Sequence, residues 1–83
     1  MRGARGAKPL ALVTGATGYI GGRLIPELLS AGYRVRVLAR NTDRLKYQPW
    51  LNLVEVFEGD ATNPTAVSAS LKSVDVAYYL LHA

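Results

Sequence analysis

The sequence predicts an α/β fold of three layers, in which a partial parallel sheet in strand order 3-2-1-4 carries crossover helices on its faces. First, short apolar segments alternate along the chain with segments of helical periodicity. This alternation is typical of a parallel sheet, because each return to a parallel strand needs a right-handed crossover. Second, a glycine-rich turn separates the first apolar segment from the first helical one. Third, the composition is globular, with 49% apolar and 19% charged residues.

The first two elements are a buried strand and an amphipathic helix. Residues 8–14 contain an unbroken apolar run at positions 10–13, which predicts a strand buried on both faces. Residues 19–31 repeat apolar side chains at helical spacing, and Gly32 is placed to end that helix. Pro26 lacks a backbone N–H and crowds the carbonyl of Gly22, so we expect a kink or a loosened first turn.

The second strand is predicted over residues 33–39, where arginine alternates with valine. After it, Asn41 or Thr42 is placed to cap a short helix that runs through Tyr47. A third strand is predicted over residues 53–58, where apolar and acidic residues alternate.

A second crossover helix and a fourth strand complete the pattern. Asn63 is a good N-cap and Pro64 suits the first helical position. Residues 74–81 are almost continuously apolar, which predicts a buried strand. The predicted buried face of the helix consists of Ala66, Val67, Ser70 and Leu71.

The glycine-rich turn is the strongest functional signal. Gly15, Gly18 and Gly21 lie where a strand ends and a helix begins, which is the arrangement that binds a pyrophosphate at a helix N-terminus. One glycine permits the tight turn, one allows close approach of phosphate, and one allows the helix to pack on the strand. A purely structural turn is the alternative. The candidate phosphate-binding residues are Gly15, Ala16, Thr17, Gly18, Tyr19, Ile20 and Gly21.

The end of the second predicted strand distinguishes between cofactors. An NAD site has an acidic residue there for the ribose 2′-hydroxyl, whereas this chain has Arg40 and Asn41. The guanidinium of Arg40 suits a 2′-phosphate, which favours NADP(H). Asp43 keeps NAD open, because a longer loop would bring it to the ribose. Arg44 either assists phosphate binding or is a surface charge.

Two further strand ends carry candidate ligand contacts. Asp60 and Ala61 follow the third strand, where the carboxylate would accept from the adenine amino group or would merely close a turn. Leu81 and His82 lie at the carboxyl end of the fourth strand, beside the crevice where ligands bind in such sheets. His82 would contact ribose or substrate, or act as an acid or base, or remain solvated.

Composition excludes several other classes of function. The chain has no cysteine and one histidine, which argues against disulfides and metal centres and favours a cytoplasmic protein. No apolar run approaches the roughly 18 residues that span a membrane. A net charge of +4 would suit nucleic acid, but the stacking aromatics of a single-strand binder are not arrayed on neighbouring strands. We therefore expect a nicotinamide dinucleotide as the ligand rather than nucleic acid.

Four segments resemble the N-terminal portion of an atypical or extended short-chain dehydrogenase/reductase, in the NmrA-like NAD(P)H-binding group. They are TGATGYIGGRLIPELL, VRVLARN, EGDAT and VDVAYYLLHA, and the resemblance covers residues 9–83. It implies the Rossmann fold and a nicotinamide dinucleotide bound by the residues at matching positions. These are Gly15, Thr17, Gly18, Tyr19, Ile20, Arg40, Asp60 and Ala61.

The catalytic signature of that family does not carry over. Its active members use a tyrosine with a lysine four residues later, and none of the five tyrosines here has that partner. We therefore assign no catalytic residue. The leading hypothesis is the cofactor-binding portion of an NADP(H)-dependent oxidoreductase or epimerase. The alternatives are a non-catalytic dinucleotide sensor and a basic nucleic-acid binder.

The predicted domain organisation is a basic flexible tail at residues 1–8 followed by a truncated Rossmann domain at 9–83. A doubly wound fold ordinarily continues with strands beside the fourth. The strand at 74–81 would otherwise be an uncovered edge, which favours aggregation. We therefore expect a half-domain completed by further chain, by a second copy or by a partner.

Overall fold

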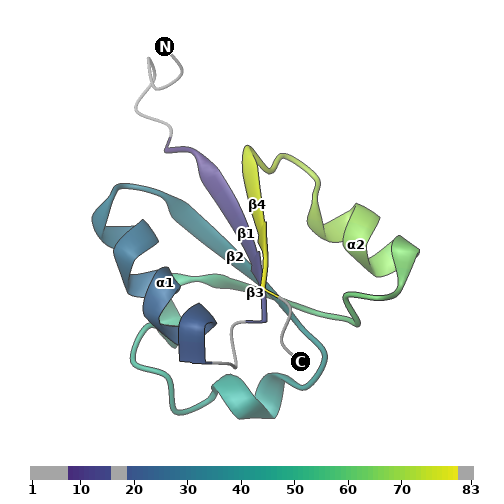
Figure 1. Ribbon diagram of the computed structural model, residues 1–83, viewed down its shortest axis with the longest axis horizontal. Helices are drawn as coiled ribbons and strands as arrows, with labels where there is room; N and C mark the ends of the chain where they lie inside the picture. Colours follow the sequence, from purple (N-terminus) through teal and green to yellow (C-terminus); the bar gives the residue numbers. More distant parts are fainter. Residues whose placement is uncertain (1–7, 16–18, 81–83) are drawn as a thin grey trace.

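The computed structural model of the chain describes residues 8–15 and 19–80, which form a four-stranded parallel sheet with α1 on one side and α2 on the other (Figure 1). This confirms the predicted fold class. In chain order the elements are β1 (Leu10–Thr14), α1 (Tyr19–Ser30), β2 (Arg34–Ala39), the 3₁₀ turns η2 (Thr42–Leu45) and η3 (Leu51–Leu53), β3 (Glu55–Glu58), α2 (Pro64–Ser70) and β4 (Val76–Tyr79).

The sheet has the predicted strand order, β3-β2-β1-β4. The central strand β1 pairs with β2 from Leu10 to Thr14 and with β4 from Ala11 to Thr14. All five of its residues are buried, as expected for an unbroken apolar run between two neighbours. At its start, Leu10 exchanges two hydrogen bonds of 2.8 Å with Asp75, one to the carboxylate and one from the backbone N–H. These bonds set the register of β4 against β1.

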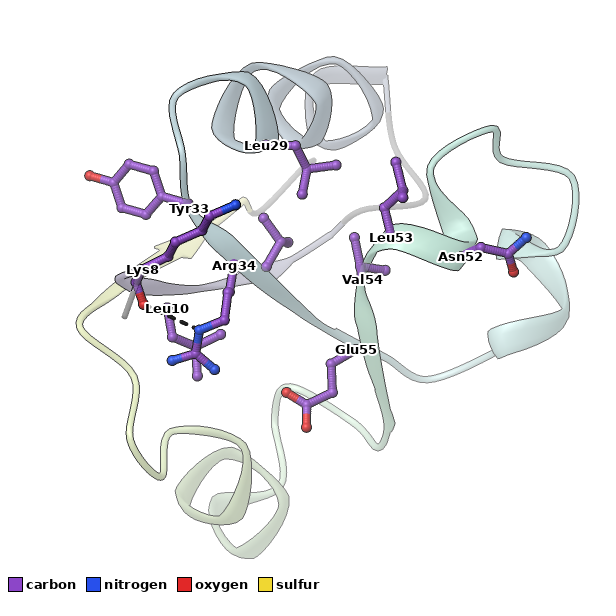
Figure 2. Close-up of a pocket in the computed structure, with 10 residues that line it drawn as sticks. Lys8, Leu10, Leu29, Tyr33, Arg34, Asn52, Leu53, Val54 and Glu55 are labelled. Carbon is purple, nitrogen blue, oxygen red and sulfur yellow. Dashed lines mark hydrogen bonds between the residues drawn. The ribbon is translucent and has the colours of Figure 1, made fainter. Parts of the chain in front are cut away.

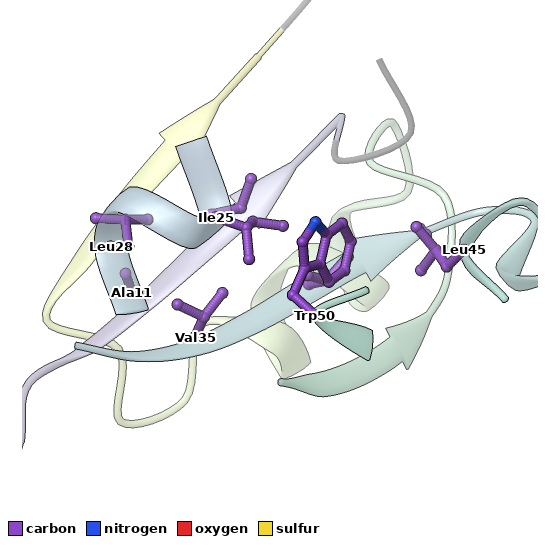
Figure 3. Close-up of a cluster of buried hydrophobic side chains, with 9 residues drawn as sticks. Ala11, Ile25, Leu28, Val35, Leu45 and Trp50 are labelled. Carbon is purple, nitrogen blue, oxygen red and sulfur yellow. The ribbon is translucent and has the colours of Figure 1, made fainter. Parts of the chain in front are cut away.

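The larger core lies between the sheet and α1 (Figure 3). Ile25 and Leu28 of α1 are buried against side chains of β1 and β2, among them Ala11. The segment after β2 extends this core through Leu45 and Trp50, which are 0% and 3% exposed. Burying an apolar side chain of this size contributes about 1.5–3 kcal/mol. The Leu45 and Trp50 side chains therefore hold the connection from β2 to β3 against the sheet.

The opposite face of the sheet is centred on a buried arginine. Arg36 of β2 is 9% exposed, and its Nε donates to the Glu55 carboxylate of β3 at 2.9 Å. Its Nη1 donates to the carbonyls of Ser70 and Lys72 at 2.7 and 2.8 Å, and the guanidinium lies 4.8 Å from the centre of the Phe57 ring. The positive charge thus satisfies carbonyls at the carboxyl end of α2. Arg36 joins three elements and is not part of a basic surface.

The end of α1 confirms the predicted role of Gly32. Gly32 has φ +93, its N–H donates to the Leu29 carbonyl at 3.1 Å, and the Tyr33 N–H donates to the Leu28 carbonyl at 3.0 Å. This pair of bonds is the Schellman motif, which needs a left-handed residue. The helix runs without interruption through Pro26, which faces solvent.

Three elements differ from their predicted form. The helix expected through Tyr47 is a 3₁₀ turn that ends at Leu45, and β3 begins at Glu55 because residues 51–53 form a second such turn. The fourth strand is shorter than 74–81, and its residues alternate between half-buried and exposed, with Tyr79 46% exposed. The expectation of a fully buried fourth strand is wrong for the described residues, because β4 pairs only with β1 and lies at the edge of this sheet.

Candidate functional site

The carboxyl ends of the four strands meet at one edge of the sheet. The register places Thr14 beside Leu38 of β2 and beside Tyr79 of β4, and Leu38 beside Phe57 of β3. The loops that follow these strands therefore start side by side, at the edge where parallel sheets bind ligands. Those residues proposed for the site that the structure describes belong to these loops or to the start of α1.

Gly15 is the first residue of the turn after β1, and only glycine fits there. Its φ is +80, and a Cβ at this position would collide with the carbonyl oxygen of Leu80 and lie 3.1 Å from the Leu80 Cβ. Leu80 in turn donates its N–H to the Thr14 carbonyl at 3.4 Å. The residue after β1 is thus in close contact with the residue after β4. The sequence anticipated the tight turn but not this neighbour.

The helix that follows the turn starts where an anion site requires it. α1 begins at Tyr19, and its first turn contains no acidic residue. The unpaired N–H groups and the helix dipole of such an N-terminus favour a negative ligand. Gly21 is buried, which agrees with close packing of α1 on the sheet, and Ile20 is 66% exposed. The predicted contacts Ala16, Thr17, Gly18, Leu81 and His82 lie outside the described residues.

Arg40 and Asp60 come together at this edge from two different strands. Arg40 follows β2 and Asp60 follows β3, and the guanidinium Nη1 lies 3.8 Å from the carboxylate Oδ2. The Arg40 side chain is 80% exposed and the Asp60 side chain 41% exposed. Hydrogen bonds from the Thr62 backbone N–H and hydroxyl, and then the Arg40 charge, hold the pKa of Asp60 below its ordinary value. The carboxylate is therefore ionised at neutral pH.

The turn after β3 holds the Asp60 carboxylate in one orientation. Its Oδ1 accepts from the Thr62 N–H at 2.9 Å and from the Thr62 hydroxyl at 2.8 Å, while its backbone carbonyl accepts from the Asn63 N–H at 2.9 Å. A Cβ at Gly59 would lie 3.0 Å from that of Ala66, so α2 packs closely on this turn. Closing the turn uses Oδ1, and Oδ2 faces Arg40. Thr62 was missed, although an aspartate two residues before a threonine is a recognisable turn pattern.

The remaining predicted residues lie after β2 and β3. Asn41 caps η2, because its side chain accepts from the Asp43 N–H at 3.1 Å. Arg44 lies exposed on η2, and Ala61 is exposed beside Asp60. In residues 8–15 and 19–80, no group of three or more His, Cys, Asp or Glu side chains is placed to hold a metal ion.

A shallow groove of about 550 Å³ lies at the opposite edge of the sheet, around the amino ends of β1, β2 and β3 (Figure 2). Its lining includes Lys8, Tyr33, Arg34, Leu53 and Glu55, and Arg34 Nε donates to the Lys8 carbonyl at 3.2 Å. None of the residues predicted for the site lines it. The groove and the glycine turn are therefore separate features.

The described residues that follow the carboxyl ends of the strands fit an anionic nucleotide. Gly15 turns the chain out of β1 shortly before the N-terminus of α1, which favours a negative ligand. Arg40 offers an exposed guanidinium to a further phosphate, and Asp60 offers an acceptor oxygen. These groups line one edge, in the order in which the strands lie.

Comparisons with known proteins point to the same class of ligand. A family model described as NAD(P)H-binding matches residues 15–83. Over 68 residues the chain is 34% identical to a 3 beta-hydroxysteroid dehydrogenase/Delta 5→4-isomerase of Mycobacterium tuberculosis, covering 82% of this chain and 18% of that protein. Over 71 residues it is 37% identical to a ceramide reductase of Caulobacter vibrioides, covering 84% of this chain and 22% of that protein.

Among solved structures, a Rossmann-fold NAD(P)-binding family protein from Shigella flexneri superposes with a TM-score of 0.80, over 93% of this chain and 39% of that one. The two are 22% identical, so this likeness concerns the fold alone. The chain spans about a fifth of the length of the curated relatives that it matches. The chain belongs to the NAD(P)H-binding family and has the dinucleotide-binding Rossmann fold of oxidoreductases that resemble short-chain dehydrogenases and epimerases.

Proposed function

We propose that the chain binds NADP(H) in preference to NAD(H), with Arg40 receiving the 2′-phosphate. The observation that carries this proposal is the Arg40 side chain, 80% exposed in the loop directly after β2, where NAD sites have a carboxylate. Arginine pairs with phosphate through two parallel N–H groups and stacks on flat rings. Asp43 lies three residues further, exposed on η2, and it is the residue that would serve NAD instead.

The other predicted contacts distribute along the same edge. The turn from Gly15 to Gly21 is proposed to hold the pyrophosphate through backbone N–H groups. Asp60 Oδ2 is proposed to accept from the adenine amino group, because its Oδ1 is already occupied by Thr62. The remaining proposed contacts are Asn41, Arg44, Ala61, Leu81 and His82.

For the whole protein we propose an oxidoreductase or epimerase. The bound dinucleotide supplies hydride chemistry, and this chain orients it. A second candidate is a non-catalytic dinucleotide sensor. The whole protein's sequence beyond residue 83 discriminates the two: a tyrosine with a lysine four positions later there favours the enzyme, and its absence there favours the sensor.

Location and assembly also belong to this proposal. Over the described residues, each helix is too short or too polar to cross a membrane. We propose a cytoplasmic protein, on the basis of its lack of cysteine. We also propose that a second copy or another partner covers the outer edge of β4, where Tyr79 is 46% exposed.

The preference is tested by titrating the protein with NADPH and NADH in a calorimeter. We expect the wild type to bind NADPH more tightly. Arg40→Ala removes a charge-assisted phosphate contact of about 1.5–3 kcal/mol, so its NADPH affinity falls about 10- to 100-fold while its NADH affinity changes little. Lys46→Ala, six residues further and exposed, is the matched control for loss of a positive charge, because Lys46 is not among the proposed contacts. Equal losses of both dinucleotides in Arg40→Ala would refute the 2′-phosphate role.

A further inference from the structure

Asp60 lies beside Arg40, the residue that is proposed to select NADP(H). Its Oδ2 is 3.8 Å from Arg40 Nη1, and within the described residues neither side chain forms another ion pair. We infer that Asp60 is a specificity-determining residue, whose negative charge opposes the 2′-phosphate and limits the preference for NADP(H). This inference rests on the proposed function, because it requires that Arg40 receive the phosphate.

The carboxylate is held where it acts on Arg40 and on any anion that Arg40 attracts. Two hydrogen bonds from Thr62 anchor Oδ1, so the group cannot turn away from the loop after β2. Arg40 is different. At 3.8 Å its guanidinium is beyond the 2.7–2.9 Å typical of a charge-assisted hydrogen bond, and its side chain is mostly exposed. Arg40 is thus free to direct its donors toward a ligand, while Asp60 keeps its position.

The charges determine whether Asp60 strengthens or weakens NADPH binding relative to NADH binding. Without ligand, the Asp60 carboxylate attracts the Arg40 guanidinium. A 2′-phosphate beside Arg40 would compete for that guanidinium and would also be repelled by Asp60, whereas the neutral 2′-hydroxyl of NAD(H) is not repelled. Removal of the Asp60 charge should therefore strengthen NADPH binding relative to NADH binding. Any contact of Asp60 with adenine is common to both dinucleotides and cancels in the ratio of their affinities.

The test is Asp60→Asn, which removes the charge and retains a side-chain oxygen for the Thr62 donors. Kd values for NADPH and NADH are measured by calorimetry on the protein and on this variant. We expect the ratio of NADPH to NADH affinity to rise about three- to tenfold at low salt, as for unit charges separated by a few ångströms near a surface. At about 0.5 M salt the gain should shrink, because the Debye length falls to a few ångströms.

The matched control is Glu58→Gln, which removes the same charge from the exposed end of β3 two residues earlier. We expect its ratio to change less than about twofold. Asp60→Ser is a second variant, which removes the charge and keeps a hydroxyl acceptor in the turn. Circular dichroism and thermal unfolding are used to check that each variant is folded, and the ratio of NADPH to NADH affinity is compared only for folded variants.

The outcomes separate this inference from the proposed function. An unchanged or lowered ratio in folded Asp60→Asn and Asp60→Ser, while Arg40→Ala still lowers it, overturns the role of Asp60 and leaves Arg40 as the phosphate site. A ratio that rises equally in Glu58→Gln also overturns it, because the effect would then be general. No NADPH preference in the wild type and no response to Arg40→Ala overturns the proposed function itself.

Discussion

Gly15 shows how one residue serves two demands at once. Its left-handed φ turns the chain out of β1, and the absence of a Cβ lets Leu80 approach from β4. Sequence motif reasoning predicted the first demand, because glycine after an apolar strand is typical of a phosphate-binding turn. The second depends on which strand lies next to β1, so it became visible only when the chain was folded.

The two demands separate in Gly15→Ala and Gly32→Ala. Both positions have positive φ, but a Cβ at Gly32 meets nothing within 4 Å, whereas one at Gly15 meets backbone. We expect Gly32→Ala to cost about 1–2 kcal/mol from its backbone conformation alone. Gly15→Ala should cost more, about 2–4 kcal/mol, and should weaken binding of both dinucleotides. Urea denaturation measures the difference, and equal costs would show that β4 does not restrict this residue.

At the scale of elements, β2 presents two arginines that the sequence cannot tell apart. Arg34 and Arg36 alternate with valines and share one face of the strand. Arg34 is exposed, and its Nε donates to the Lys8 carbonyl. Arg36 is covered by α2, and its Nη1 donates to the carbonyl of Ser70 in that helix. A pattern of period two predicts the face of a strand but not what covers it. The sequence pattern therefore does not separate the buried Arg36 from the exposed Arg34.

This difference should appear in stability. Arg36→Met leaves the Ser70 and Lys72 carbonyls without their donor, so we expect a loss of about 2–3 kcal/mol in the free energy of unfolding. Arg34→Met, two residues earlier on the same face, is the control and should cost less than about 1 kcal/mol. Denaturant titrations compare the two variants. A similar small cost at both positions would mean that Arg36 does not hold α2 on the sheet.

At the scale of the whole molecule, ligand binding and folding are coupled. The candidate site is built from loops after β1, β2 and β3, so an unfolded chain has no such site. A ligand that binds only the folded chain stabilises it by RT ln(1 + [L]/Kd), about 2.7 kcal/mol at 100 times Kd. In a domain of this size each kcal/mol raises Tm by about 4–8 °C.

We therefore expect NADPH at 100 times its Kd to raise Tm by about 10–20 °C, as followed by circular dichroism. NADH at 100 times its own Kd should give the same shift, because the gain depends only on the ratio of concentration to Kd. Arg40→Ala should need more NADPH for an equal shift. A Tm that does not depend on dinucleotide concentration would show that the site does not form in this chain.

The amino-acid sequence predicted the fold class, the strand order and the edge of the sheet at which the candidate site residues lie. It could do so because apolar periodicity, turn glycines and right-handed crossovers are local or nearly universal constraints. Only the folded chain shows that Gly15 abuts Leu80, that Arg36 is buried under α2, and that Arg40 and Asp60 form a pair. Each of these involves residues from separate elements, and their proximity follows from packing and register, which no single segment encodes.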